Sequence, residues 1–401
     1  MREELVVVRV FDPERDRHGA EAVEEMCEVG PSGKMALFTH LCDPVSRVCH
    51  SPAYLMLVAE IAGPEKEIVG LIRGCIKTAT CGKKPHRYPA RQQNPIYTKL
   101  AYILGLRVSP SHRRLGIGLK LVKGMEEWFK EKGAEYAYMA TDKDNEASVK
   151  LFTARCGYSK FRTPSILVNP VFAHRLPVTR RAIILRLSPA DAETIYRRRF
   201  ATTEFFPRDI DAVLRNPLSI GTFIAVFSDS RSASANWTGA GSFLDDPPES
   251  WAVLSVWNCK EVFRMEVRGA SRLRRALARA TRLADRALQW LQIPSIPDLF
   301  HPFGLYFLYG LGGDGPGAAE LVRALCALGH NLARDGGCGV VATEVAACEP
   351  LRGGIPHWRR LSCDEDLWCV KRLADDYSDG AVGDWTKSPP PPSIFVDPRE
   401  F

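Results

Sequence analysis

The chain has 401 residues, which is too long for one ordinary compact domain and predicts two. Hydrophobic residues make up 45% and charged residues 25%, as in soluble globular proteins, and no run approaches the roughly 18 apolar residues of a membrane span. The formal net charge of +7 favours an anionic partner such as a charged cofactor, and this small excess does not by itself indicate nucleic-acid binding.

The cysteines and the first residues bear on metals and compartment. The 12 cysteines show no Cys-x-x-Cys pair and no Cys/His ligand spacing, so no metal site is predicted. Residues 1–10 contain acidic residues and a short apolar run, which indicates a strand and not a signal peptide. We therefore expect an intracellular protein, nuclear or cytoplasmic, whose thiols are reduced and whose sequon at Asn236 carries no sugar.

The first half alternates strand and helix patterns and predicts one domain over residues 1–170. Strand patterns occupy residues 5–10, 54–61, 68–78, 100–108, 136–141 and 158–168, and helical patterns residues 19–29, 115–132 and 147–155. Gly63-Pro64 predicts a hairpin between the second and third strands. This order predicts an α+β (α/β layered) fold, with a mixed central sheet flanked by helices.

A Pro-containing linker over residues 171–180 is predicted to precede a second domain, residues 181–375. Ser188, Pro189 and Asp191 predict a capped helix start, and a Ser/Gly-rich loop is expected at 228–246. Strand patterns follow at 222–227, 251–257, 262–267, near 309, at 339–343 and at 367–370, with helices at 271–291 and 318–334. The order repeats the first half and predicts an internal duplication.

Two segments outside these patterns carry further expectations. The Arg-dense stretch from Arg264 to Arg286 is interpreted as the solvated face of a basic helix in preference to a DNA-binding face, because no helix-turn-helix or finger pattern accompanies it. Residues 376–401 form a Pro-rich C-terminal tail, and Ile394-Phe395-Val396 within it is expected to dock onto the body.

The most informative motif is Arg113-x-x-Gly116-x-Gly118, which follows a strand and opens a helix. The first amides of a helix lack internal partners and its dipole favours anions, so the motif suits a pyrophosphate, and Arg114 adds charge. A Rossmann motif would need a third glycine, and a P-loop would need Gly-Lys-Ser/Thr; both are absent. A helix start whose glycines only permit close packing is the alternative.

The motif resembles the Arg/Gln-x-x-Gly-x-Gly/Ala loop of the GNAT superfamily of N-acetyltransferases. Asn145-Glu-Ala-Ser148-Val-Lys-Leu151-Phe152, followed by Gly157-Tyr158, extends the resemblance over about residues 5–168, with one residue more than usual before Gly157. The whole chain also resembles the plant HOOKLESS-type probable N-acetyltransferases, which carry a second, divergent half. The resemblance implies a GNAT-type first domain and a degenerate GNAT-like second one.

The resemblance also implies an acetyl-CoA (CoA) site and transfer of an acetyl group to an amine that attacks directly in a ternary complex. Backbone groups of Leu106 and Val108 are expected to bind the pantetheine arm. The expected cofactor-binding residues are Leu106, Arg107, Val108, Arg113, Arg114, Leu115, Gly116, Ile117, Gly118, Leu119, Asn145, Ser148 and Phe152. The implied partner is an amine-bearing acceptor, a protein lysine or N-terminus (a histone included) or a small amine, with no direct nucleic acid and no membrane.

The chain departs from the family at the positions that supply proton transfer. Phe152 stands where a tyrosine often protonates the thiolate, Tyr102 where histone-type members have a glutamate, and Ala140 where some members have a histidine. Tyr102 and Tyr138 remain as candidate catalytic residues, and the alternative is that both pack in the core. A catalytically weak acyl-CoA-binding regulator or scaffold is therefore the second functional hypothesis.

The second half lacks the features that mark the first as a cofactor site. Its glycine-rich turn, residues 310–317, has no arginine at the phosphate position, and Asp314 would repel an anion. We expect this half to be structural or to shape the substrate site.

Overall fold

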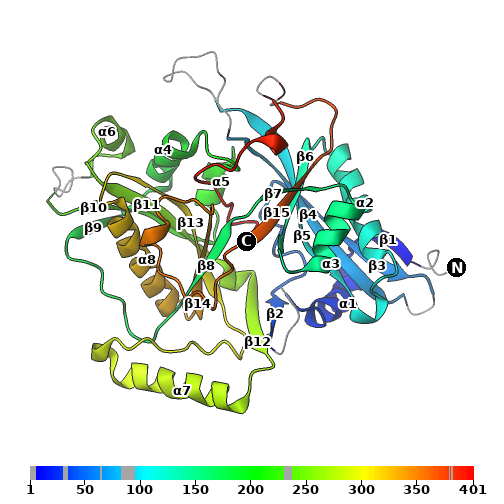
Figure 1. Cartoon of the computed structure of the whole chain (residues 1–401), viewed down its shortest axis with the longest axis horizontal. Helices are drawn as coiled ribbons and strands as arrows, with labels where there is room; N and C mark the ends of the chain where they lie inside the picture. Colours follow the sequence, from blue (N-terminus) through cyan, green and yellow to red (C-terminus); the bar gives the residue numbers. More distant parts are fainter. Residues whose placement is uncertain are drawn as a thin grey trace.

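Two mixed β-sheets, each flanked by helices, lie next to each other in the computed structural model, which describes residues 6–29, 35–63, 66–82, 95–229, 237–378, 380 and 383–401 (Figure 1). The first sheet has the strand order β1-β3-β4-β5-β6-β15-β7. Its elements and their helices are β1 (Val6–Val10), α1 (Pro13–Glu25), β3 (Ala53–Ile61), β4 (Ile68–Thr80), β5 (Tyr97–Val108), α2 (Ile117–Glu131), β6 (Tyr136–Asp142), α3 (Glu146–Lys150), β7 (Ser159–Arg162) and β15 (Asp366–Arg372).

The second sheet has the order β8-β14-β13-β11-β10-β9. Its elements are β8 (Ser165–Pro170), β9 (Ala182–Leu187), α4 (Pro189–Phe200), α5 (Ile210–Leu214), β10 (Ser219–Phe227), α6 (Ala240–Asp245), β11 (Trp251–Asn258), α7 (Arg272–Ala287), β13 (Leu305–Asp314), α8 (Ala318–Asp335) and β14 (Val340–Val345). Three sequence-based details are corrected. α6 lies within the expected loop, β13 continues to Asp314 through the expected turn, and α1 begins at Pro13 because Asp12 caps it.

The two sheets exchange strands, which the sequence did not predict. β8, which we expected in the first unit, pairs with β14 in the second sheet. β15, which we expected to close the second unit, lies between β6 and β7 in the first sheet, with Trp368 opposite Ala140. The assignment of residues 367–370 to the second unit is therefore wrong. β2 (Ala36–Leu41) and β12 (Phe263–Arg268), one from each half, form a separate two-stranded sheet.

Matching geometry in the two sheets supports the predicted duplication. β5 and β6 pair in parallel over four rungs, and so do β13 and β14. Each pair stops two residues before a left-handed glycine, Gly105 or Gly310, both with φ +61. In both cases the neighbouring antiparallel ladder shifts register beside that glycine, as a β-bulge does.

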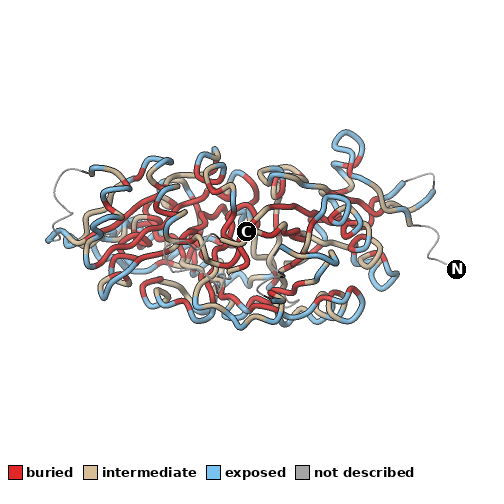
Figure 2. The backbone as a smooth tube through the Cα atoms, turned by 90° about the horizontal axis from the view of Figure 1, so that it is seen from above, coloured by how far each residue is buried: buried red, intermediate tan, exposed pale blue. Residues whose placement is uncertain are grey.

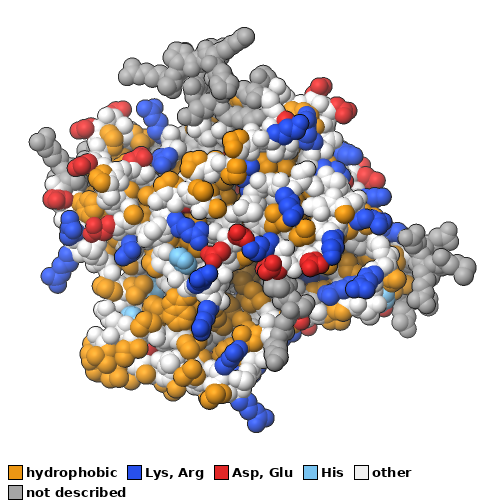
Figure 3. Space-filling model, viewed as in Figure 1, with side chains coloured by type: hydrophobic (Ala, Val, Ile, Leu, Met, Phe, Trp, Pro, Cys, Tyr) orange, Lys and Arg blue, Asp and Glu red, His pale blue; other side chains and the backbone are white. Residues whose placement is uncertain are grey.

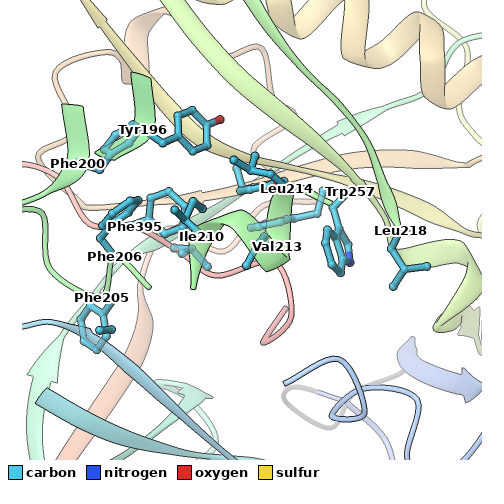
Figure 4. Packing of buried hydrophobic residues seen from close by; sticks show 14 of the residues in the cluster. Tyr196, Phe200, Phe205, Phe206, Ile210, Val213, Leu214, Leu218, Trp257 and Phe395 are labelled. Atoms are coloured by element: carbon cyan, nitrogen blue, oxygen red, sulfur yellow. The ribbon is translucent and has the colours of Figure 1, made fainter. Parts of the chain in front are cut away.

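The largest hydrophobic cluster lies between the two halves, where Figure 2 shows buried backbone along the middle of the molecule. Figure 4 shows that α4, the turn after it and the C-terminal segment all contribute rings. Phe205 packs edge-on against Trp368, with ring centroids 5.0 Å apart, and Phe206 against Phe395 at 5.1 Å. The expectation that Ile394-Phe395-Val396 docks the tail is confirmed, because Phe395 and Val396 are buried.

Helix α7 lies at the lower edge of the view in Figure 1, and hydrophobic side chains gather there in Figure 3. Its inner side buries Ala278 and Asp285, while Leu273, Leu277 and Leu283 are exposed. The solvent-facing surface of this basic helix is therefore partly apolar. Among the described residues, no helix is long and apolar enough to span a bilayer, and no three His, Cys, Asp or Glu side chains cluster as a metal site.

Candidate functional site

The parallel pair formed by β5 and β6 ends partway along both strands. It runs from Leu100 opposite Tyr136 to Ile103 opposite Met139. Beyond that rung, β5 stays paired with β4, and β6 with β15. One edge of β5 past Gly105 thus has no strand partner among the described residues, so backbone groups on that edge are available to a ligand.

A bulge at Gly105 helps to separate the two strands. The register of β4 and β5 shifts beside it, between Leu71 and Arg73. A Cβ at Gly105 would lie 2.7 Å from Nη1 of Arg73, and φ is +61, so both space and backbone conformation require glycine. Arg73 is itself fixed by an ion pair with Glu24 at 2.5 Å. The bulge bends the end of β5, where the predicted cofactor segment begins.

The loop after β5 presents a row of unpaired amides. Arg114 and Gly116 have left-handed backbone, with φ +65 and +78, and α2 starts directly afterwards. The first helical amide with an acceptor is that of Lys120, which bonds to the carbonyl of Gly116. In the described part of the chain, the amides of residues 113–119 have no acceptor. Because Ile117 is buried, the helix is anchored while its amide end faces solvent.

The arginines of this region have different roles. Arg113 and Arg114 are exposed, and neither forms an ion pair with a carboxylate of the described residues. Arg113 Nε donates a long hydrogen bond of 3.3 Å to the carbonyl of Val108. Arg107 instead lies 3.3 Å from a carboxylate oxygen of Glu24, so its guanidinium is engaged within the protein. Positive charge for an anion therefore comes from Arg113 and Arg114, together with the helix dipole.

Asn145 caps the next helix beside this loop. Its Oδ1 accepts a hydrogen bond from the amide of Ser148 at 3.2 Å, and its side-chain amide NH₂ has no acceptor among the described residues. The helix lies against the start of α2, because a Cβ at Gly118 would be 3.4 Å from Leu151. The fold thus brings Asn145 and the loop together, although they are about 30 residues apart in sequence.

A π-helical turn over Leu151–Arg155 explains the extra residue before Gly157. Such a turn accommodates one inserted residue without breaking the helix. Phe152, within it, is 1% exposed and packs edge-on against Tyr158, with centroids 5.2 Å apart. The Phe152 side chain therefore lies in the core of the first sheet, in the same hydrophobic cluster as Ile117.

The predicted cofactor residues thus fall in three places. Most of them lie at the end of β5 or around the α2 start, two lie at the α3 start, and one lies in the core. In that order they are Leu106, Arg107, Val108, Arg113, Arg114, Leu115, Gly116, Ile117, Gly118 and Leu119; Asn145 and Ser148; and Phe152.

Tyr102 and Tyr138 are opposite each other on β5 and β6, one rung before the strands part. Their rings are 4.7 Å apart, and burial raises the pKa of both phenols well above the usual value. Both therefore stay protonated at neutral pH and can donate, but not accept, a proton. Tyr138 donates a 2.5 Å hydrogen bond to Glu400 Oε2, which also accepts one from Lys77. No local pattern pointed to Lys77 or Glu400, because each lies far from its hydrogen-bond partner along the chain.

In the second half, the start of α8 corresponds to the start of α2, and there a side chain of the protein already occupies a helix-terminal amide. The amide of Gly317, at the start of α8, donates to Ser250 Oγ at 3.0 Å. A Cβ at Gly313 would lie 2.5 Å from the carbonyl of Trp251, so β13 is packed closely there. The helix terminus that corresponds to the α2 start is thus already partly capped, and Asp314 is exposed beside it. This arrangement agrees with a structural role for the second half.

Comparison with known proteins places these observations in a family. Residues 23–158 match the model of the acetyltransferase (GNAT) family. The probable N-acetyltransferase HLS1 of Arabidopsis thaliana is 66% identical, over 99% of this chain and 100% of its own length. The acetyl transferase GW6a of Oryza sativa subsp. japonica is 43% identical, over 100% of this chain and 99% of its own.

The fold extends to a distant solved structure. N-myristoyltransferase of Saccharomyces cerevisiae, with bound myristoyl-CoA, superposes with a TM-score of 0.53 at 11% identity, over 98% of this chain and 83% of that one. The similarity covers both sheets, so the paired arrangement is a property of the whole fold.

Proposed function

Because the chain belongs to the GNAT family of acetyltransferases and is an N-acetyltransferase, we propose that it moves the acetyl group of acetyl-CoA to an amine. The observation that carries the proposal is the start of α2. There the amides of residues 113–119, which have no acceptor among the described residues, and two exposed arginines lie beside the gap between β5 and β6. An anion-binding helix start next to an open strand edge suits an extended molecule with a diphosphate at one end.

The residues of the first half would hold the molecule in two sections. The amides from Arg113 to Leu119, with the guanidinium groups of Arg113 and Arg114, would bind the diphosphate. The free edge of β5, at Leu106 and Val108, would bond the amide-containing arm as an added strand does. The side-chain NH₂ of Asn145 is a further donor. Bound there, acetyl-CoA supplies an activated acyl group on a thioester.

The chemistry left to the protein is proton transfer and charge stabilisation. An acceptor amine is protonated at neutral pH and must lose a proton before it can attack a carbonyl carbon. Tyr102 and Tyr138 stay protonated, so they would act as hydrogen-bond donors at the reacting groups and not as the base. The acceptor would be a protein lysine, an N-terminus or a small amine.

Calorimetric titration with acetyl-CoA tests the binding site directly. Arg113→Ala removes a charged donor from an exposed side chain, worth about 1.5–3 kcal/mol, so affinity should fall roughly tenfold to 100-fold. Gly116→Glu places a carboxylate at the helix start and should abolish binding. Gly353→Glu adds the same charge where a side chain meets open space, and should bind like the wild type.

Transfer to a panel of peptides with one free lysine or N-terminus and of small polyamines then tests the activity. Turnover by the wild type, lost in Gly116→Glu, supports the proposal. Binding of acetyl-CoA without transfer to any member would favour the acyl-CoA-binding regulator. Absence of binding by the folded wild type would refute the cofactor site.

A further inference from the structure

The C-terminal segment of the sequence enters the interior between the two sheets. The end of the chain lies at the centre of the molecule in Figures 1 and 2. Asp397, Arg399 and Glu400 are all buried, with exposed fractions of 1%, 5% and 7%. Three charged side chains in one buried stretch need strong compensation, so the segment is held there by specific partners.

The partners of Glu400 belong to the strands that form the candidate site. Oε2 accepts hydrogen bonds from the Tyr138 hydroxyl on β6 at 2.5 Å and from Lys77 Nζ on β4 at 2.7 Å. Oε1 is fully buried and has no hydrogen-bond partner in the described part of the chain. A buried carboxylate oxygen without a donor is costly, which points to a donor that arrives with a ligand.

Glu400 is also close to the point where β5 and β6 part. Tyr138 is opposite Tyr102, and the ladder ends one rung later at Met139. The carboxylate is therefore one hydrogen bond from the rung next to the last one before the gap. Tyr102 and Tyr138 pack in the cluster between the two halves, whereas Met139 packs in the cluster under α2. Glu400 thus lies on the face of the sheet opposite α2.

Several titratable groups set the basicity of Glu400. Lys77 and Cys75 face it from β4, Tyr102 from β5, Tyr138 from β6, Glu344 from β14 and Asp397 from its own segment. Burial and the negative charge of Asp397 raise the pKa of Glu400, while Lys77 and the Tyr138 hydroxyl oppose that rise. The result is a carboxylate more basic than an exposed glutamate.

A pocket leads from the surface to the partners of this segment. It has a volume of about 440 Å³, and its walls include Lys77, Lys99, Arg208, Asp209 and Asp211. Lys77 bonds Glu400, and Asp209 forms two hydrogen bonds with Arg399, of 2.6 and 3.1 Å. The inner wall of the pocket is therefore built from residues that hold the C-terminal segment.

We propose that Glu400 is the general base that takes the proton from the acceptor amine, which enters through this pocket. Tyr138 and Lys77 are positioning residues that hold Oε2, so that Oε1 faces the amine. The inference rests on the proposed function and adds to it the base and the acceptor route. It assigns a catalytic role to a residue about 260 positions from the tyrosine that orients it.

The proposed step conserves atoms and charge. The acceptor ammonium group gives one proton to Glu400 Oε1 and becomes a neutral amine. Its nitrogen attacks the thioester carbonyl carbon; a C–N bond forms and the C–S bond breaks. The second amine proton leaves with the sulfur as a thiol, and Glu400 later releases its proton to solvent. The sum is ammonium plus thioester giving amide, thiol and one proton.

Glu400→Gln tests the base with little change in shape. We expect kcat to fall about 100-fold or more with the best acceptor of the panel, while acetyl-CoA affinity by titration stays unchanged. Glu127→Gln makes the same change on the exposed side of α2 and should keep wild-type kcat. Unchanged kcat in Glu400→Gln, with a folded protein, would overturn the inference and leave the proposed function standing.

Two further measurements test whether Glu400 acts as the base, besides the kcat of Glu400→Gln. pH-difference infrared spectra of the protein without acyl donor should show the carbonyl stretch of protonated Glu400, absent from Glu400→Gln, with a pKa that matches the acid limb of kcat/KM. Tyr138→Phe removes a donor to the carboxylate, so that limb should move to higher pH. If the infrared pKa and the kinetic limb differ, or if Tyr138→Phe leaves the limb in place, Glu400 is not the base. Absence of transfer by the wild type would instead refute the proposed function.

Discussion

Replacing Asp285 with alanine is expected to lower the free energy of unfolding by about 3–5 kcal/mol. Asp285 lies on α7, away from β5 and β6 in Figure 1, and is 1% exposed. Its carboxylate accepts hydrogen bonds from the amides of Ala173 and His174, at 2.7 and 3.1 Å, from His174 Nδ1 at 2.7 Å, and from the Ser295 hydroxyl. It therefore fixes the connection between β8 and β9.

The expected loss of unfolding free energy follows from the four hydrogen-bond donors that would have no acceptor in Asp285→Ala. A buried donor left without an acceptor costs about 1–3 kcal/mol, so four such donors give an upper bound well above the measured range for single substitutions. Water that enters the space left by the carboxylate would satisfy part of the group. The net loss should therefore lie near the value for breaking a buried ionic network, about 3–5 kcal/mol.

Urea unfolding at neutral pH measures this loss. Asp298→Ala is the matched control, because Asp298 is exposed and its hydrogen bonds within the described part of the chain are local, to His301 and Phe300. Burial opposes ionisation of Asp285, but its hydrogen bonds from Ser295, His174 and Ala173 prevail and lower its pKa. Its stabilisation is present above the unfolded-state pKa and is lost as pH falls, so wild type and variant should converge in acid. A difference below about 1 kcal/mol at neutral pH would refute the reasoning.

Three further predictions concern the first sheet. Gly74→Ala should destabilise the protein by about 1–3 kcal/mol in thermal unfolding, because a Cβ there would lie 2.8 Å from a ring carbon of α2. Glu24→Gln should cost about 3 kcal/mol in urea unfolding, since it leaves the buried guanidinium of Arg73 without its charge partner. The hydrogen bond from Arg9 lowers the pKa of Asp16 to about 2, so its stabilisation should vanish as pH falls from about 4 to 2.

Each of these predictions has a control. Gly353→Ala adds the same methyl group in open space and should leave the melting temperature unchanged. Glu127→Gln neutralises an exposed glutamate and should not alter the urea midpoint. Asp16→Asn should flatten the acid dependence of stability. If Gly74→Ala or Glu24→Gln changed stability no more than its control, the packing or charge argument for that residue would be contradicted. The argument for Asp16 would be contradicted if Asp16→Asn kept the acid dependence of the wild type.

Local chemistry made several helix starts predictable, in both halves of the chain. The spacing of Arg113, Gly116 and Gly118 placed the loop and the start of α2, and Ser188 with Pro189 placed the start of α4. In each case the signal lies within a few residues of the structure that it specifies, through a cap, a left-handed glycine or a helical apolar period. The extra residue before Gly157 also had a local consequence, the π-helical turn.

Long-range pairing was not predictable in the same way. An apolar strand pattern is the same whichever sheet receives it, so nothing in residues 366–372 distinguishes β6 from β14 as a neighbour. The partners of Glu400 were also not predictable, because an acidic residue in a Pro-rich tail is usually exposed to solvent. The predicted linker at 171–180 has no helix or strand, yet Val171 and His174 within it are buried.

The strand exchange sets the order in which this chain can be completed during synthesis. When residues 1–170 have left the ribosome, β6 still lacks its neighbour β15, and β7 has nothing to pair with until residue 372 is made. The nascent first half therefore carries an open sheet edge while more than half of the protein is still being translated. Closure of that edge, entry of the C-terminal segment and assembly of the Glu400 contacts are late events, so the candidate site matures only in the finished chain.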